Sequence, residues 1–168
     1  MKASNFFVPQ HLAVLAAVAV ICSFAVAQEQ MRGPEKYLCS DPDPQAICTA
    51  ANTCGSASAP CTVDIKRTAS DASATPSIPK AKGNQPFCVA AGTKVNWKSE
   101  SKNTGFVLDF GPSSPFGSDT IIGGSDRSPS TVATKKGCYK YSVGACVSGA
   151  IYGMCGSAET ELVVTGGQ

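Results

Sequence analysis

The chain has 168 residues, of which 43% are hydrophobic and 15% charged, and its formal net charge is +2 at pH 7. This near-neutral balance, with no basic stripe interleaved with aromatic residues, argues against nucleic-acid binding. A chain of this length can bury one moderate core, so we expect one domain plus an appendage.

The N-terminus has the features of a secretory signal peptide. Lys2 supplies a positive charge, residues 12–26 are mostly apolar, and small residues precede a cleavage site after Ala27. The alternative is an uncleaved membrane anchor, but the apolar run is shorter than the ~20 residues that a span needs. We therefore expect a mature chain that begins at Gln28, is secreted or periplasmic, and has no membrane span.

The cysteine count predicts a disulfide framework. Nine cysteines occur, and Cys22 falls in the signal peptide, which leaves an even number in the mature chain. In a small exported protein such a set indicates disulfides. The candidates are Cys39, Cys48, Cys54, Cys61, Cys88, Cys138, Cys146 and Cys155. One division pairs the first four among themselves and the last four likewise, and the sequence does not choose a pairing within it.

Residues 28–61 form a Cys-rich segment with few large apolar side chains. The Asp-Pro-Asp-Pro sequence at 41–44 is a turn signal, because each proline biases the residue before it away from helix. Residues 47–52 could form one short helical turn. We expect the cysteines, rather than a core of its own, to hold this segment together.

Residues 62–168 change to short alternating segments. The expected strands are 62–66, 87–91, a strand with Val95 and Trp97, 106–110, 131–134, 139–143 and 160–164. Residues 68–86 are expected to be a surface loop with at most a strand fragment near Ile78, and 111–130 a second long loop. Six or seven short strands separated by turns predict an all-β sandwich or barrel.

Five aromatic residues are candidates for the core of this domain. They are Trp97, Phe106, Phe110, Tyr139 and Tyr141. The alternative is that one or two of them line an exposed patch that binds a carbohydrate or a protein.

Three pieces of the chain, in this order, resemble the cupredoxin family of small blue-copper β-sandwich proteins. They are the Val-Ala-Ala-Gly-Thr-Lys-Val-Asn-Trp sequence at 89–97, Gly-Phe-Val-Leu-Asp-Phe at 105–110, and Gly-Cys-Tyr-Lys-Tyr at 137–141, which leads to Cys146 and Met154. The resemblance covers 62–168 and implies a Greek-key β-sandwich of about seven short strands, here stabilised by disulfides. The competing fold is an immunoglobulin-like sandwich.

The resemblance also implies a copper site built from two His, one Cys and a weak axial Met. Cys146 and Met154 are eight residues apart, as in plastocyanin-like members, but Gly149 stands where a ligand His would be. The only histidine, His11, lies in the signal peptide. We therefore expect no type I copper and no cofactor.

The alternation of the strand before Cys146 points the same way. Tyr139, Tyr141 and Val143 share one face of that strand, so Cys138 and Cys146 fall on the other unless Gly144 marks a bulge. A family ligand Cys would lie on the inward face.

Two roles are open for the sulfur residues of this region. In the first, Cys146 and Cys155 are in disulfides and Met154 is a packing residue. In the second, Cys146 and Met154 bind copper(I), which soft thiolate and thioether ligands select. Free thiols in an oxidising compartment count against the second role.

Candidate catalytic groups are few. A Ser or Cys nucleophile usually needs a His base, and the mature chain has none. Asp109 is expected to face solvent. Glu159 and Glu161 share one face of the last strand, where a role in strand-edge solubility is commoner than a carboxylate pair for glycoside chemistry.

The sequence therefore predicts an exported, copper-free, cupredoxin-like domain with a binding or structural role and no enzyme activity. Its partner would be an unknown protein or carbohydrate. The alternative is a soft-ligand copper(I)-binding or electron-transfer protein that uses Cys146 and Met154. A third class, a hydrolase, would need an activity that survives without His.

Overall fold

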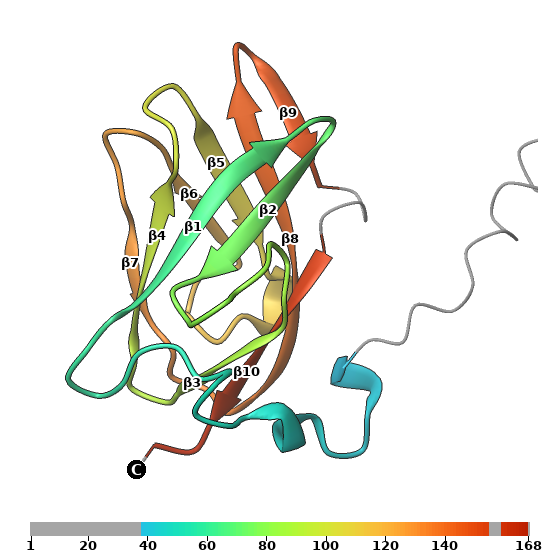
Figure 1. Cartoon of the computed structure of the whole chain (residues 1–168), viewed down its shortest axis with the longest axis vertical. Helices are drawn as coiled ribbons and strands as arrows, with labels where there is room; N and C mark the ends of the chain where they lie inside the picture. The colour runs from blue at the N-terminus through green and yellow to red at the C-terminus, as the bar shows by residue number, and fades with distance from the viewer. Residues whose placement is uncertain (1–37, 155–158, 168) are drawn as a thin grey trace, which may run out of the picture. The chain divides into compact units, whose positions relative to one another are not determined.

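Two β-sheets pack face to face in this protein (Figure 1). The computed structural model describes residues 38–154 and 159–167, so the expected signal peptide lies outside the described residues. The smaller sheet has the order β2-β1-β4-β7, with β1 (Cys61–Thr68), β2 (Asp71–Pro76), β4 (Lys94–Ser99) and β7 (Ser130–Val132).

The larger sheet has the order β3-β10-β8-β5-β6. Its strands are β3 (Phe87–Ala90), β10 (Glu159–Thr165), β8 (Gly137–Val147), β5 (Gly105–Asp109) and β6 (Thr120–Gly123). β9 (Ala150–Gly153) pairs with the end of β8. Three short 3₁₀ helices complete the described residues: η1 (Leu38–Ser40), η2 (Pro44–Ile47) and η3 (Gly111–Ser113). None of these helices is long enough to cross a membrane.

The core lies between the two sheets and is built by period-2 alternation. Val63 and Ile65 of β1 are fully buried, and so is Trp97 of β4. These side chains alternate with exposed or half-buried neighbours along each strand, as one buried and one solvated face require. The expected all-β, disulfide-stabilised sandwich is confirmed by this strand pairing.

Trp97 is the centre of an aromatic cluster. Its ring makes edge contacts with Phe110, Phe116 and Tyr141, and its Nε1 donates a hydrogen bond of 2.9 Å to Thr131 Oγ1. Burying an indole is favourable when its N–H has a partner. Of the expected core residues, Trp97, Phe106, Phe110 and Tyr141 are buried, and Tyr139 packs at the margin of the core.

Some strand predictions were wrong, because the described residues contain ten strands and not about seven. β2 lies within the expected loop 68–86, where small residues hide a strand: Ala72 and Ala74 are buried against the core although neither is strongly apolar. The strand fragment expected near Ile78 is absent, since β2 ends at Pro76. β6 lies within the second expected loop.

The expected helical turn at 47–52 was also misplaced. The turn is η2, which ends at Ile47 and begins after Asp43, whose side chain accepts a hydrogen bond from Gln45 N. Pro44 occupies the first position of the turn, where its missing N–H costs nothing.

Three disulfides hold the N-terminal segment to the sandwich. They are Cys39–Cys138, Cys48–Cys88 and Cys54–Cys61. The division into first four and last four cysteines was wrong, since two bonds cross it. The reason is that Cys39 is bonded to β8 and Cys48 to β3, both strands of the larger sheet, so the segment is not a disulfide-bonded unit of its own. Three disulfides indicate that the chain matures in an oxidising compartment.

Candidate binding surface

Cys146 lies on the outer face of the larger sheet. In the β5–β8 register Gly105 faces Cys146 and Leu108 faces Val143, without interruption. Val143 and Ala145 point into the core, so Cys146 points away from it. Gly144 does not interrupt this register as a bulge would. The chain therefore does not aim this thiol into the sandwich, where a blue-copper ligand would be needed.

Met154 lies on the same outer face as Cys146. Its backbone N–H bonds to Val143 O at 2.8 Å, and its side chain covers Gly144. A Cβ at Gly144 would lie only 2.6 Å from Met154 Cγ and 2.9 Å from Val107 Cγ1. Glycine is therefore required at 144 for Met154 and Val107 to pack over the sheet.

Gly149, at the position of a family ligand His, is a turn residue. Val147 pairs with Ala150, which leaves Ser148 and Gly149 as a two-residue hairpin loop. Both have positive φ, +51° and +80°. This backbone favours glycine and is found in the tight hairpin turns that match strand twist.

An apolar surface lies on this outer side of the sheet, and we call it the apolar face. Its members are the exposed Ile122 and Ile151 and the half-buried Val107, Cys146 and Met154. Val107 faces Ile122 in one strand pair, and Cys146 faces Ile151 in another. Ile122 is 60% exposed and Ile151 is 62% exposed. The apolar face thus crosses four adjacent strands, β6, β5, β8 and β9.

A shallow hollow of about 400 Å³ adjoins the apolar face at Ile122. Its lining runs over residues 102–105 and 122–127. Gly105 and Gly124 have no side chains and so leave bare backbone there. The charged residues Lys102, Asp126 and Arg127 make no ion pair with a described residue.

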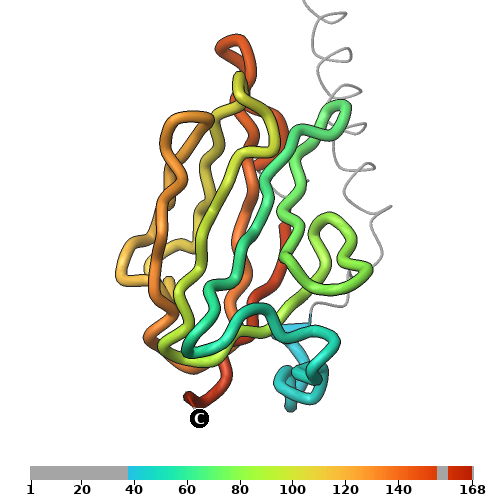
Figure 2. Tube along the Cα trace, turned by 60° about the vertical axis from the view of Figure 1, so that its left-hand side comes forward, coloured from blue at the N-terminus to red at the C-terminus, as the bar shows by residue number. Residues whose placement is uncertain are grey.

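The other half of this outer face is covered by the N-terminal segment. The disulfide Cys39–Cys138 joins η1 to β8. Beside it the Glu161 carboxylate accepts hydrogen bonds from Leu38 N at 2.8 Å and Cys39 N at 2.9 Å. The segment therefore packs over the part of the sheet that lies away from the β8–β9 hairpin (Figure 2).

Two carboxylate predictions have different outcomes. Asp109 is exposed as expected, and its Oδ1 accepts a hydrogen bond from Gly111 N. Glu161 was expected to serve strand-edge solubility, and this was wrong, since it is only 5% exposed and bonded to the backbone of η1. Sequence reasoning missed this role because the partner lies more than 120 residues away along the chain. Glu159 is exposed.

The donor set does not fit a type I copper centre. The described residues contain no histidine, and no three His, Cys, Asp or Glu side chains among them lie together as a metal site. A strong trigonal copper(II) site needs imidazole nitrogen. The thiol that the spacing suggested is on the outer face of the sheet. The prediction that Cys146 is in a disulfide was wrong, because this cysteine is free among the described residues, and Cys155 lies outside them.

A second hollow, of about 530 Å³, lies where the N-terminal segment meets the ends of β3 and β10. Its lining consists of small and hydroxylic residues such as Thr53, Ser56 and Ala90. Without a charged or aromatic group in that lining, it offers little to fix a ligand's orientation.

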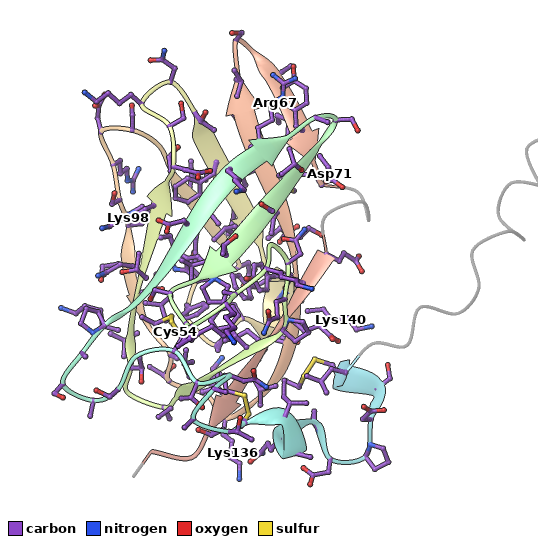
Figure 3. The ribbon with its side chains drawn as sticks, in the orientation of Figure 1. Cys54, Arg67, Asp71, Lys98, Lys136 and Lys140 are labelled. Atoms are coloured by element: carbon purple, nitrogen blue, oxygen red, sulfur yellow. A yellow bond between two sulfur atoms is a disulfide. The ribbon has the colours of Figure 1, made fainter. Side chains whose placement is uncertain are left out.

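A cation–π contact between β1 and β9 closes one end of the sandwich. The Arg67 guanidinium lies 3.9 Å from the centre of the Tyr152 ring and bonds to Ala69 O. Figure 3 shows Arg67 at the end of β1, beside β9. This contact joins the β9 hairpin, which carries Ile151, to the smaller sheet.

No protein-family model matches the chain, and no curated protein sequence is similar to it. Among solved structures it is similar to amicyanin, a cupredoxin. An oxidised methionine-to-lysine mutant of amicyanin is 13% identical, with 69% of this chain and 95% of that chain covered and a TM-score of 0.37. The reduced Cu(I) form of a proline-to-glycine mutant is 16% identical, with 62% and 80% covered and a TM-score of 0.36. This likeness concerns the fold alone, at low identity.

Proposed function

We propose that this chain is an exported, copper-free, cupredoxin-like binding module without catalysis, and that it binds a protein partner through the apolar face. The observation that carries the proposal is the exposure of Ile122 and Ile151 on one sheet surface. Large aliphatic side chains gathered on one face mark interaction sites more often than scattered ones do.

The surroundings of the apolar face suit a protein partner. Interfaces have an apolar centre and a polar rim, and here Lys102, Asp126 and Arg127 stand at one border. Carbohydrate binding through exposed aromatics has less support, because Trp97 and its aromatic neighbours are in the core.

The absence of a histidine base from the mature sequence supports a role without catalysis. Glu161, half of the carboxylate pair that a hydrolase would need, is occupied by two backbone N–H groups.

The test is a double substitution, Ile122→Ser with Ile151→Ser, and the matched control is Val132→Ser. Val132 is 42% exposed but lies on the smaller sheet. The exported chain is immobilised and exposed to culture medium of the organism that makes it, and a protein that binds is identified. That partner is then purified and titrated against the wild type and each variant. We expect the double variant to bind at least about tenfold more weakly and the control to bind as the wild type does.

Two results would contradict this function. The first is equal affinity of the double variant and the wild type, with thermal unfolding showing that both are folded. The second is an equal loss of affinity in the Val132→Ser control, which would show that any exposed aliphatic-to-serine change weakens binding.

Copper(I) binding by Cys146 and Met154 is the second candidate function. The supporting observation is that both sulfur side chains lie on the same outer face, in neighbouring rows of the sheet. A competition titration with a copper(I) chelator would compare the wild type with Cys146→Ser and with Met154→Leu, which keeps the packing over Gly144. We expect both variants to lose affinity if this function is real. An unchanged copper(I) affinity in Met154→Leu would exclude this function, and so would a wild type that binds no copper(I).

A further inference from the structure

The edges of the two sheets are not equally protected. An unpaired edge strand can pair with another chain, and proteins usually cover such edges. The β3 edge is covered by the N-terminal segment, because Cys54 N bonds to Cys88 O and Cys88 N bonds to Asn52 O.

Asn84 covers the β2 edge. Its Oδ1 accepts from Ala74 N at 2.8 Å, its Nδ2 donates to Ala72 O at 3.1 Å, and its backbone N bonds to Ala74 O. One residue thus occupies the positions that a neighbouring strand would use.

The β6 edge is covered only beyond its last residue, where Gly124 exchanges backbone hydrogen bonds with Arg127. Phe110 N donates a hydrogen bond to Asp119 O, so these two residues are a hydrogen-bonded pair of the antiparallel β5–β6 ladder. Along β6, residues that bond to β5 then alternate with residues that do not. The backbone groups of Thr120 and Ile122 therefore point away from β5. Thr120 N and both backbone groups of Ile122 have no hydrogen-bond partner among the described residues, and both side chains are exposed. Within the described ranges the Thr120 carbonyl accepts only from Ser118 Oγ, which leaves it a second lone pair.

We propose that β6 is a dimerisation edge, where a second copy of this chain adds its own β6 in antiparallel orientation. With a twofold axis at Ile121, Thr120 of one copy faces Ile122 of the second copy, and each pair exchanges both backbone hydrogen bonds. Thr120 and Ile122 make these bonds in both copies, so the contact is closed and self-complementary.

Charge at the two ends of β6 favours this antiparallel pairing. Asp119 precedes the strand, and Arg127 is held beside its far end by reciprocal backbone bonds with Gly124 of 2.9 and 3.2 Å. Antiparallel pairing places Asp119 next to Gly123 of the second copy, close to that copy's Arg127. Both side chains are exposed and neither makes an ion pair with a described residue.

The other open edge, β7, is less suited to the same contact. It has only three residues, one fewer than β6. Beyond it Thr134 N already bonds to Pro115 O.

A β6 dimer would also place two apolar faces on the same side of one continuous sheet. This follows because residues opposite one another in an antiparallel pair point to the same face. A partner with two sites would then be bound bivalently. Dimerisation does not depend on the proposed function, since a monomer can also bind through its apolar face.

The experiment is sedimentation velocity of the exported full chain over a range of concentrations, with thiols blocked to exclude linkage through Cys146. Thr120→Pro removes an edge N–H but keeps the apolar face, and Val132→Pro makes the same change on β7. We expect the wild type and Val132→Pro to dimerise and Thr120→Pro to dimerise at least about tenfold more weakly.

Charge reversal gives an independent measurement. Asp119→Arg and Arg127→Asp should each weaken the dimer, and the double variant should restore it, because the two charges exchange places. A wild type that is monomeric at about 0.1 mM would overturn the proposal. A dimer insensitive to Thr120→Pro, or one that the double reversal fails to restore, would also overturn it.

Discussion

At the scale of single residues, Glu161 shows how a buried charge is accommodated. It is the one acidic side chain buried among the described residues, and two backbone N–H groups of η1 satisfy its carboxylate. Hydrogen bonds to a charged acceptor are stronger than neutral ones, so this contact stabilises the attachment of the N-terminal segment.

Replacing Glu161 by Gln should lower the free energy of unfolding by about 1–3 kcal/mol, because a neutral amide is a weaker acceptor and brings donors that find no partner there. The matched control is Glu159→Gln on the same strand, which is exposed and should change stability by less than ~0.5 kcal/mol. Urea unfolding of the two variants measures the difference. Equal stability of both would show that the two hydrogen bonds contribute nothing.

Tyr141 has the opposite situation, since its buried hydroxyl has no hydrogen-bond partner among the described residues. Burial raises the pKa of Tyr141 far above its ordinary value, an effect that the nearby Thr160 hydroxyl offsets only in part. The folded state therefore keeps the proton at a pH where the unfolded chain, with a pKa near 10, releases it.

The stability contributed by neutral Tyr141 should be complete below about pH 10 and decline as the pH rises above it, by up to ~1.4 kcal/mol per pH unit. Tyr141→Phe cannot ionise and should lack this part of the decline. Urea unfolding at pH 8 to 11 of both proteins, taken as a difference, removes the contribution of lysines. Parallel pH profiles of the two proteins would contradict the assignment.

At the scale of elements, alternation in the sequence predicted the strands whose large apolar residues recur at every second position. The strands with Val63 and Ile65 or with Phe106 and Leu108 are of this kind. β2 could not be predicted in this way, because Ala72 and Ala74 carry too little apolar area to distinguish a strand from a loop. The disulfide pairing could not be predicted either, since it depends on which strand the N-terminal segment packs against.

The candidate site was predicted only in part. Alternation along the strand predicted that Cys146 lies on the opposite face from Tyr141, and the register between β5 and β8 confirms this. The apolar face as a whole needed the register between strands, because Ile122 and Ile151 are far apart in the sequence and come together only through β5 and β8.

Asn84 gives a prediction for the loop that covers β2. Its side chain makes two hydrogen bonds and its backbone has φ of +57°. Asn84→Gly should cost about 1–3 kcal/mol, since it removes the amide but keeps the favoured backbone. Asn84→Ala should cost about 1 kcal/mol more, because alanine is strained at positive φ. If chemical unfolding gave the same loss of stability for Asn84→Gly and Asn84→Ala, backbone strain at this position would play no part.

At the scale of the whole molecule, the three disulfides differ in exposure. Cys54 and Cys61 are both fully buried, and Cys88 is fully buried opposite half-buried Cys48. Cys39 and Cys138 are both half-buried, so the bond that joins η1 to the larger sheet is the most accessible to a reductant.

Mild reduction of the folded protein should therefore open Cys39–Cys138 first and Cys54–Cys61 last, because thiol–disulfide exchange requires access to a sulfur. Opening the first bond releases a loop of 99 residues, and this should lower the free energy of unfolding by about 2–4 kcal/mol. Differential alkylation followed by mass spectrometry gives the order, and urea unfolding of Cys39→Ala with Cys138→Ala gives the cost. If Cys54–Cys61 opened first, the sandwich would have to unfold before any reduction. The N-terminal segment would then be part of the cooperative core and not a strap that can be released from the outer face of the sheet.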